Sequence, residues 1–96
     1  MRFIYDPKKS AANLEKHGID FEEAKQLWND PHFYVDHSNR NGEERWMGIA
    51  RLQGSCWTVI YTKRDYAIRI ISVRRSLPKE VSCYDKAFAR NDGRRI

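Results

Sequence analysis

The order of the secondary-structure signals predicts an α+β domain, in which helices cover an antiparallel sheet. Two helical segments follow a short apolar strand, a run of consecutive strands comes next, and a last helix follows the strands. Helices that are segregated from consecutive strands in this way are typical of an α+β architecture. The 96 residues are enough for one such domain, which we place at residues 1–90.

Capping residues predict the two N-terminal helices. Asp6 can cap a helix over residues 7–17, and Gly18 is a good residue just past a helix end. Asp20 caps the second helix, with Glu23 at the spacing of a capping box. The apolar residues of this second helix recur at helical period and are Phe21, Ala24, Leu27 and Trp28. We expect both helices to pack on one face of the sheet.

The middle of the chain predicts a meander of antiparallel strands. We expect strands at residues 2–5, 33–36, 43–52, 55–63 and 67–74. Residues 37–42 are turn formers and predict a polar loop, and Gln53-Gly54 predicts a tight hairpin. Pro78 then opens a C-terminal helix, while residues 91–96 have no apolar period and are expected to fray as a basic tail.

The charge balance favours an anionic partner. Eighteen Lys and Arg against thirteen Asp and Glu give a net charge of +5 and a pI near 9.4, which suits nucleic acid or an acidic protein. A basic protein with solvated charges fits the same numbers. No long apolar run opens the chain, so we expect a cytoplasmic protein with no membrane partner. Cys56 and Cys83 lack a metal-ligand spacing and predict two reduced thiols.

Several short blocks follow one another in order from Phe3 to about Tyr84. The blocks are Phe3 with Tyr5-Asp6-Pro7, Asn13, Lys16-His17-Gly18 with Phe21 and Ala24, Gly42-Glu43-Glu44-Arg45, Gly48, Ile71-Ser72-Val73-Arg74, and Glu80 with Tyr84. In this order they resemble the BrnT family of bacterial type II toxins. The Lys-His-Gly block followed by the Ile-Ser-Val-Arg strand is the more specific part. Arg75 departs from the small residue or proline that some relatives have at that place.

The resemblance implies a RelE-like ribonuclease fold and a toxin that inhibits translation by cleaving RNA. It also implies a partner, the antitoxin BrnA, which is a small ribbon-helix-helix DNA binder that neutralises the toxin. The complex then binds operator DNA through the antitoxin, and a heterotetramer of the two proteins fits this arrangement. We expect the antitoxin to cover the cationic groove, because that blocks the RNA directly.

The residues themselves predict no metal site and no cofactor. The three histidines are not at a ligand spacing with the cysteines, and no paired acidic motif suggests Mg²⁺. A ribonuclease of this kind would be metal-independent, with the ribose 2′-hydroxyl attacking the adjacent phosphate to leave a 2′,3′-cyclic phosphate and a 5′-hydroxyl. That reaction needs a base, cations at the developing charge and an acid for the leaving oxygen.

His17 and Lys16 are candidates at the end of the first helix. His17 has an imidazole that titrates near working pH, so it is a candidate acid or base. The plainer interpretation is a helix-end histidine whose charge favours the last carbonyls. Lys16 either binds phosphate or has the same helix-end role.

Arg69 and Arg74 are candidate catalytic cations, because an arginine in an isoleucine-rich strand needs a partner or a groove. Strict alternation places the two on opposite faces of the sheet unless a bulge redirects Arg74. The structural alternative pairs Arg69 with Glu43 or Glu44 across strands. A catalytic site nevertheless requires the guanidinium groups and the His17 imidazole to converge over one patch of the sheet.

Glu44 and Arg45 open a strand and carry two interpretations each. Glu44 is either a catalytic base or a solvated charge, and Arg45 either clamps a phosphate or balances Glu43. Arg64 and Arg75 complete the cationic groups that we expect to contact RNA.

The aromatic candidates are a tryptophan and a tyrosine. Trp46 alternates opposite Arg45 and can stack on a base, whereas Trp57 shares a face with Val59 and is expected in the core. Tyr84 lies on the apolar stripe of the last helix, so it either packs in the core or hydrogen-bonds the phosphate.

Two other functions fit the same sequence. A RelE-like fold can serve a non-catalytic toxin that binds a protein target such as gyrase, and fold alone does not decide between them. A plain nucleic-acid binder that recognises the backbone would show affinity that falls steeply with salt, without any product.

Overall fold

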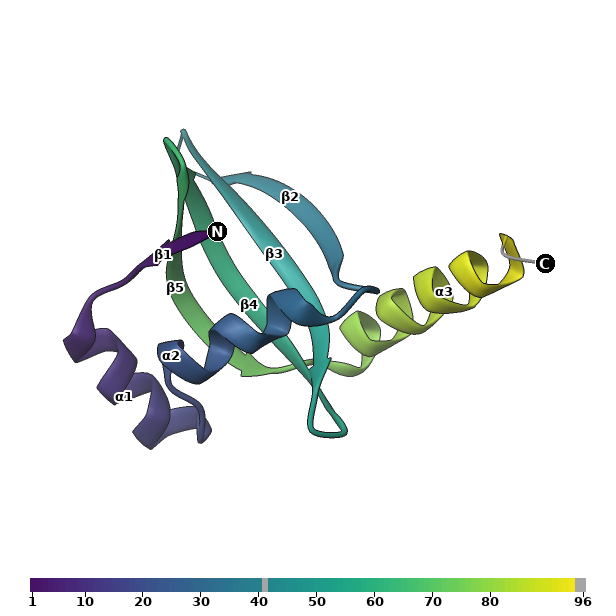
Figure 1. The fold of residues 1–96 in the computed structure, drawn as a ribbon, viewed down its shortest axis with the longest axis horizontal. Coiled ribbons are helices and arrows are strands. Elements are labelled where there is room, and N and C mark those ends of the chain that lie inside the picture. Colours follow the sequence, from purple (N-terminus) through teal and green to yellow (C-terminus); the bar gives the residue numbers. More distant parts are fainter. Residues whose placement is uncertain (41, 95–96) are drawn as a thin grey trace.

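The computed structural model describes the backbone of residues 1–40 and 42–94 and the side chains of residues 1–37 and 42–90. Its centre is one mixed sheet of five strands in the order β1-β5-β4-β3-β2 (Figure 1). The strands are β1 (Arg2–Ile4), β2 (Tyr34–Arg40), β3 (Glu43–Leu52), β4 (Ser55–Arg64) and β5 (Ala67–Arg75). β2 to β5 form an antiparallel meander, and β1 pairs with β5 in parallel. The predicted α+β class is therefore confirmed.

The helices begin at the residues that predicted them, but the second predicted helix is divided into an α-helical part and a 3₁₀ part. They are α1 (Pro7–His17), α2 (Phe21–Ala24), a 3₁₀ segment η1 (Lys25–Asn29) and α3 (Pro78–Arg94). The Asp6 carboxylate accepts from the Lys8 backbone N–H, and α1 ends at Gly18 with φ 79°, the left-handed conformation that glycine adopts without strain. The Asp20 carboxylate accepts from the Glu23 backbone N–H at the start of α2.

The main core lies between the sheet and α1, α2 and η1, on what we call the helical face. Its buried members are Ile19, Phe21, Ala24, Leu27, Ala50, Trp57, Val59, Tyr61, Ile68, Ile70 and Val73. α2 and η1 cross in front of β3 and β4 in Figure 1. Gly48 lies under the ring of Phe33, which is so near that a Cβ at this position would approach the ring to 2.2 Å. That close contact lets the aromatic side chains Phe33 and Trp28 stack over the middle of β3, with ring centroids 5.1 Å apart.

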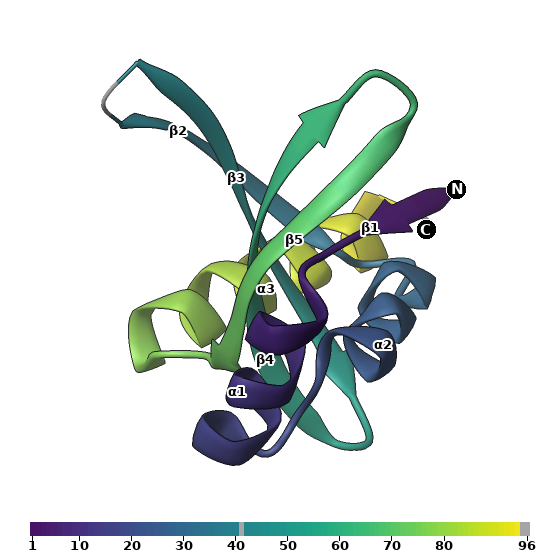
Figure 2. The same cartoon turned by 90° about the vertical axis from the view of Figure 1, so that its left-hand side faces the viewer.

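α3 packs against the opposite face of the sheet. Its Glu80 and Tyr84 are buried, and Glu80 bonds to Thr58, whose side chain points away from the helical face. The helix leaves the end of β5 and extends beyond the strands in Figure 1, and Figure 2 shows it starting at the end of β5 and running behind the sheet. It continues to Arg94, past residue 90, where we expected the domain to end, although Asn91, Asp92 and Gly93 are weak helix formers.

The second strand is longer than its sequence predicted. Residues 37–40, expected in a polar loop, extend β2 in register with β3, so that part of the loop prediction is wrong. Pairing with β3 overrides the turn preference of these residues, because each backbone N–H and C=O gains a partner in the ladder. Residue 41 lies outside the described residues. The Gln53-Gly54 hairpin is confirmed, with φ 53° and 83° at the two turn residues.

Asn13 ties α1 to the free edge of β5. Its side-chain amide donates to the carbonyls of Val73 and Ile19 at 2.9 and 2.8 Å, and its side-chain oxygen accepts from the Val73 backbone N–H at 3.2 Å. The side chain is 8% exposed. Asn13 therefore takes the place of a neighbouring strand where β1 has already ended.

Candidate nucleic-acid interface

A β-bulge decides which side chains of β5 share a face. Ile60 pairs with Ser72 while its neighbour Tyr61 pairs with Ile70, so Ile71 has no partner in β4. The extra residue shifts the alternation of β5 by one position. Arg69 and Arg74 consequently point to the same side of the sheet, because β5 contains the bulge that we named as the exception to strict alternation.

These side chains build what we call the arginine face, the face of the sheet that carries Arg45, Arg51, Arg69 and Arg74. The pairing Arg69–Thr62 in the β4–β5 ladder continues to Arg45 of β3, since Trp46 pairs with Tyr61. Arg69 and Arg45 are therefore separated by one strand, about 10 Å across the sheet. The next rows along the strands hold Ser72 with Ile60, and then Arg74 with Thr58.

Arg45 and Arg69 are the two arginines of this face that α3 leaves open. Arg45 is 41% exposed and reaches Glu43 at 3.3 Å, a contact that contributes little at a solvated surface. Arg69 is half-buried and makes no ion pair within residues 1–37 and 42–90. The predicted alternative that pairs Arg69 with Glu43 or Glu44 is thus not what the structure shows.

Arg74 is held by Glu80 of α3. Two parallel hydrogen bonds of 2.8 and 2.9 Å join the guanidinium to the carboxylate, which also accepts from Thr58 and from the Leu77 backbone N–H. The guanidinium holds the pKa of Glu80 at about 2, well below its usual value of 4.5. Glu80 is therefore ionised at any physiological pH, and Arg74 is fixed in place.

Tyr84 is buried in the same interface and points away from solvent. Its hydroxyl donates to the Asp30 carboxylate at 2.7 Å, and burial together with that carboxylate raises the pKa of the phenol. Burial would raise the pKa of Asp30 as well, but hydrogen bonds from the Arg51 backbone N–H and Tyr84 lower it. The core role predicted for Tyr84 is the one that this geometry supports.

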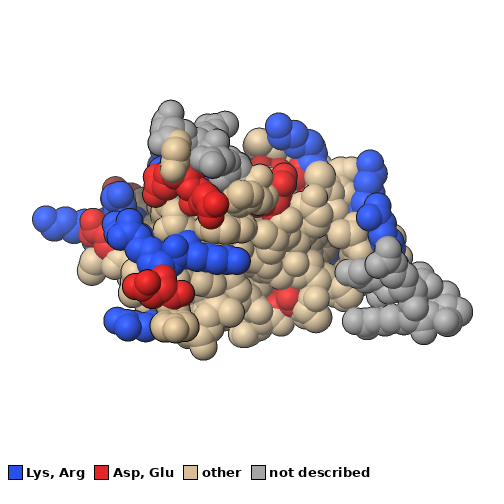
Figure 3. Space-filling model, turned by 90° about the horizontal axis from the view of Figure 1, so that it is seen from above, with Lys and Arg blue, Asp and Glu red and all other residues tan. Residues whose placement is uncertain are grey.

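The arginine face continues toward the β4–β5 hairpin. Arg64 is exposed and, with Arg2 and Ile4, lines a hollow of about 490 Å³ beside Tyr66. Ile4 pairs with Arg69, so this hollow adjoins the row that contains Arg69 and Thr62. Viewed from above, the molecule shows Lys and Arg side chains interleaved with acidic ones at its left end and uncharged residues in the middle (Figure 3).

A family model described as the ribonuclease toxin BrnT of type II toxin-antitoxin systems matches residues 5–80. The chain belongs to the BrnT family. No curated protein matches it. The matched span contains β2 to β5 and ends at Glu80, the residue that fixes Arg74. As a member of a type II toxin-antitoxin family, this BrnT chain has a protein antitoxin as its partner.

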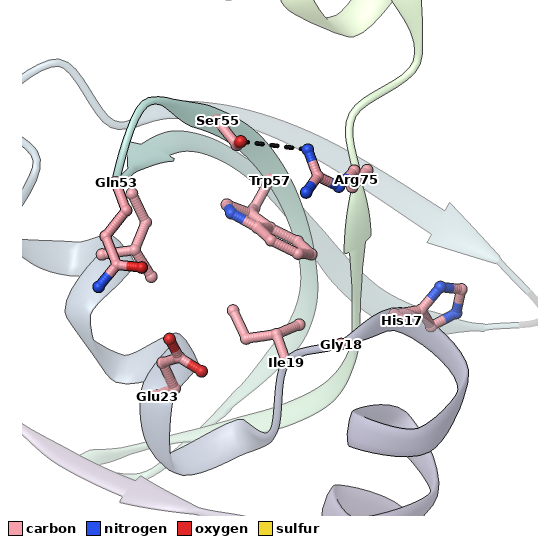
Figure 4. Close-up of a pocket in the computed structure, with 9 residues that line it drawn as sticks. His17, Gly18, Ile19, Glu23, Gln53, Ser55, Trp57 and Arg75 are labelled. Atoms are coloured by element: carbon pink, nitrogen blue, oxygen red, sulfur yellow. Dashed lines mark hydrogen bonds between the residues drawn. The ribbon is translucent and has the colours of Figure 1, made fainter.

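The helical face of this BrnT chain holds a second cluster of predicted site residues. The guanidinium carbon of Arg75 lies 5.0 Å from the centroid of the Trp57 ring, and this guanidinium donates to the Ser55 hydroxyl at 3.1 Å. These residues line a cavity of about 270 Å³ (Figure 4). His17 lies at the rim of this cavity with its ring pointing away from Trp57. Trp57 is buried as predicted, at 8% exposure. Lys16 is exposed on α1 and lines a neighbouring hollow with Ile71.

Glu44 and Trp46 also lie on the helical face, because Trp46 pairs with Tyr61 of the core. The Trp46 ring is half-buried and already has neighbours: the Lys63 ammonium is 4.6 Å from its centroid, and the His37 ring centroid lies at 5.0 Å. Glu44 is exposed and makes no ion pair among the described side chains.

The structure therefore divides the predicted site between two faces. It brings Arg45, Arg64, Arg69 and Arg74 together, while His17, Lys16, Glu44, Trp46 and Arg75 lie on the helical face or its rim. The expected convergence of His17 with Arg74 over one patch does not occur, so a catalytic site built from these two residues together is wrong. Sequence reasoning missed Thr62, Thr58 and the site role of Glu80. The bulge in β5 decides which of these residues share a face, and no short-range sequence pattern marks its position.

Within the described residues, no group of three or more His, Cys, Asp or Glu side chains is arranged to hold a metal ion. The described helices include none that is long and apolar enough to cross a membrane.

Proposed function

We propose that this BrnT chain is a RelE-like endoribonuclease toxin that binds the RNA backbone on its arginine face and cleaves it without a metal ion. Cleavage of RNA in the cytoplasm then inhibits translation, and a ribbon-helix-helix antitoxin that also binds operator DNA neutralises the toxin. The observation that carries the proposal is the row Arg45–Thr62–Arg69, where two open guanidinium groups flank one position of the sheet.

The proposed reaction uses charge stabilisation by these arginines. The ribose 2′-oxygen forms a bond to the phosphorus as its proton passes to a water molecule, while the bond from phosphorus to the 5′-oxygen breaks and that oxygen takes a proton from water. The products are a 2′,3′-cyclic phosphate and a 5′-hydroxyl. Arg45 and Arg69 would neutralise the negative charge that builds on the phosphoryl oxygens, which is where fixed cations lower a barrier most. Arg74 is paired with the ionised Glu80, so it would add little net charge and would mainly hold the end of β5 in place.

Incubation of the purified protein with RNA in EDTA tests this proposal directly. We expect cleavage products that end in a 2′,3′-cyclic phosphate, with a known metal-independent ribonuclease as the positive control. Arg69→Ala should lower the cleavage rate at least a hundredfold, because the lost cation acts on the transition state. Lys8→Ala removes the same charge from α1 on the other side of the sheet and should cleave like the wild type.

His17→Ala asks whether the helical-face cluster takes part. If His17→Ala abolishes cleavage while Arg69→Ala leaves it intact, the reaction occurs on the helical face and the arginine face is the wrong site. An intact substrate beside a working positive control would reject the nuclease altogether.

A second candidate function is a non-catalytic toxin that binds an acidic protein target such as gyrase. The separation of His17 from the arginines favours it, since an imidazole is the most common acid-base group and lies on the other face here. Expression that stops growth with RNA intact, together with capture of a topoisomerase by the toxin, would support this function over the nuclease.

A further inference from the structure

Three buried side-chain atoms among the described residues have no hydrogen-bond partner: His32 Nδ1, Arg45 Nε and Thr62 Oγ1. Two of them, Arg45 Nε and Thr62 Oγ1, belong to adjacent strands in the same row of the arginine face. His32 lies elsewhere, against Phe88 of α3. Two orphaned donors side by side on an otherwise well-bonded sheet need an explanation.

An unpaired buried hydroxyl is costly. Thr62 is only 4% exposed, so water does not replace the missing partner, and the fold bears the cost of removing this hydroxyl from water. Valine has the same shape as threonine without this cost. A ligand that brings an acceptor atom to the row would recover the lost energy.

Thr58 supplies an internal comparison. It lies on the same strand and the same face and is fully buried, yet its hydroxyl contacts both the Glu80 carboxylate at 2.9 Å and the Ser76 hydroxyl at 2.8 Å. The fold therefore satisfies a buried threonine where α3 covers the sheet. It leaves the other one unsatisfied in the row between Arg45 and Arg69.

We propose that Thr62 and Arg45 form a two-donor site for a non-bridging oxygen of the scissile RNA phosphate, which makes Thr62 a further substrate-contacting residue. This inference rests on the proposed function. The Thr62 hydroxyl and the Arg45 Nε–H both donate to that oxygen, and Arg69 faces it from the other side of β4. Their effect is largest when the phosphorane gains its second negative charge, because fixed donors then need no reorganisation.

Arg45 is able to leave its present partner. Its guanidinium holds Glu43 through one contact of 3.3 Å at an exposed position, which is a weak restraint. A phosphate competes well for this guanidinium, since charge-assisted bonds to phosphate are among the strongest that arginine makes. Arg45 can thus exchange Glu43 for the RNA phosphate.

Thr62→Val tests the site, because it removes the hydroxyl and keeps the shape. We expect RNA cleavage to fall roughly a hundredfold while the melting temperature stays equal or rises. Thr62→Ser keeps a hydroxyl and should retain most of the activity. Thr58→Val is the matched control for losing a buried hydroxyl that has partners, and it should lower the melting temperature. If Thr62→Val does not fold, Thr62→Ala gives the same comparison.

A second measurement separates this inference from the proposed function. Binding of a 2′-O-methyl RNA, which cannot be cleaved, should weaken roughly tenfold in Thr62→Val. If the wild type cleaves and Thr62→Val cleaves equally well, the two-donor site is wrong and the nuclease stands. If the wild type does not cleave, the nuclease is wrong, and the binding comparison alone decides the site: weaker binding supports it, and unchanged binding overturns it.

Discussion

Glu80 is the residue on which the arginine face depends. One buried carboxylate, 4% exposed, accepts hydrogen bonds from Arg74, Thr58 and the Leu77 backbone N–H. It therefore fixes a guanidinium, a strand hydroxyl and the start of α3 at once. The bond to Leu77 is half of a capping box, in which the third helical residue reaches back to the residue before the helix.

Replacement of Glu80 should change stability in a pH-dependent way. Because its pKa is about 2 in the folded protein and 4.5 ordinarily, the ionised carboxylate contributes stability above pH 4.5 that is lost as the pH falls toward 2. A shift of this size corresponds to about 3 kcal/mol. Glu80→Gln keeps an oxygen for Leu77 but loses the charge, so we expect it to be about 3 kcal/mol less stable at pH 7. Urea unfolding at pH 7 and pH 3 measures this difference, which should shrink at the lower pH; a difference that does not change with pH would contradict the assignment.

Secondary-structure elements are joined here by a few polar side chains as well as by the core. Asn13 joins α1 to the edge of β5, and Tyr84 joins α3 to Asp30 at the end of η1. The bulge at Ile71 is a feature of a different kind, since it sets the face on which the end of β5 presents its side chains. Each acts at a place where the regular ladder stops.

Asn13→Ala should separate α1 from β5. The change leaves the Val73 N–H and C=O and the Ile19 C=O without their partner, and buried groups left unsatisfied cost roughly 1–3 kcal/mol each. We expect a loss of about 3 kcal/mol in the free energy of unfolding, with partial compensation by water at this edge. Faster hydrogen exchange at the Val73 amide would locate the effect. Ala12→Gly, a change at an exposed position on the same helix, controls for weakened α1 without the polar contacts.

At the scale of the whole molecule, the positive charge is divided between two faces. The net charge of +5 is not gathered on one surface: the arginine face carries Arg64 besides its four defining arginines, while His17, Lys16 and Arg75 border the helical face. An RNA strand held on the arginine face would contact Arg45, Arg69 and Arg64 and leave the helical face free. The antitoxin of this BrnT chain can then bind either surface, but it would block the RNA directly only if it binds the arginine face.

The salt dependence of RNA binding should report how many phosphates the arginine face holds. If Arg45, Arg64 and Arg69 each neutralise one phosphate, the log–log plot of affinity for single-stranded RNA against salt has a slope of roughly −2, from about 0.7 per contact. Arg69→Ala should flatten the slope by about 0.7, and Lys8→Ala should leave it unchanged. Fluorescence anisotropy with 2′-O-methyl RNA measures both. A slope that Arg69→Ala does not alter would place the RNA elsewhere.

Local signals predicted the elements well. Asp6, Asp20, Gly18 and the Gln53-Gly54 pair predicted where helices and turns begin and end, because each acts through bonds to residues a few positions away. Local reasoning was wrong for residues 37–40, where pairing with β3 provides partners that the sequence of β2 does not show.

The amino-acid sequence by itself determined the α+β class, the helix ends, the basic character and the resemblance to the BrnT family, because all of these are written in composition and short-range order. Only the tertiary structure decided which arginines share a face. One unpaired residue, Ile71, reverses the alternation of β5, and a bulge forms when β4 and β5 pair, not from the preference of any single residue. The same pairing placed Thr62 between Arg45 and Arg69 and left His17 on the other side of the sheet.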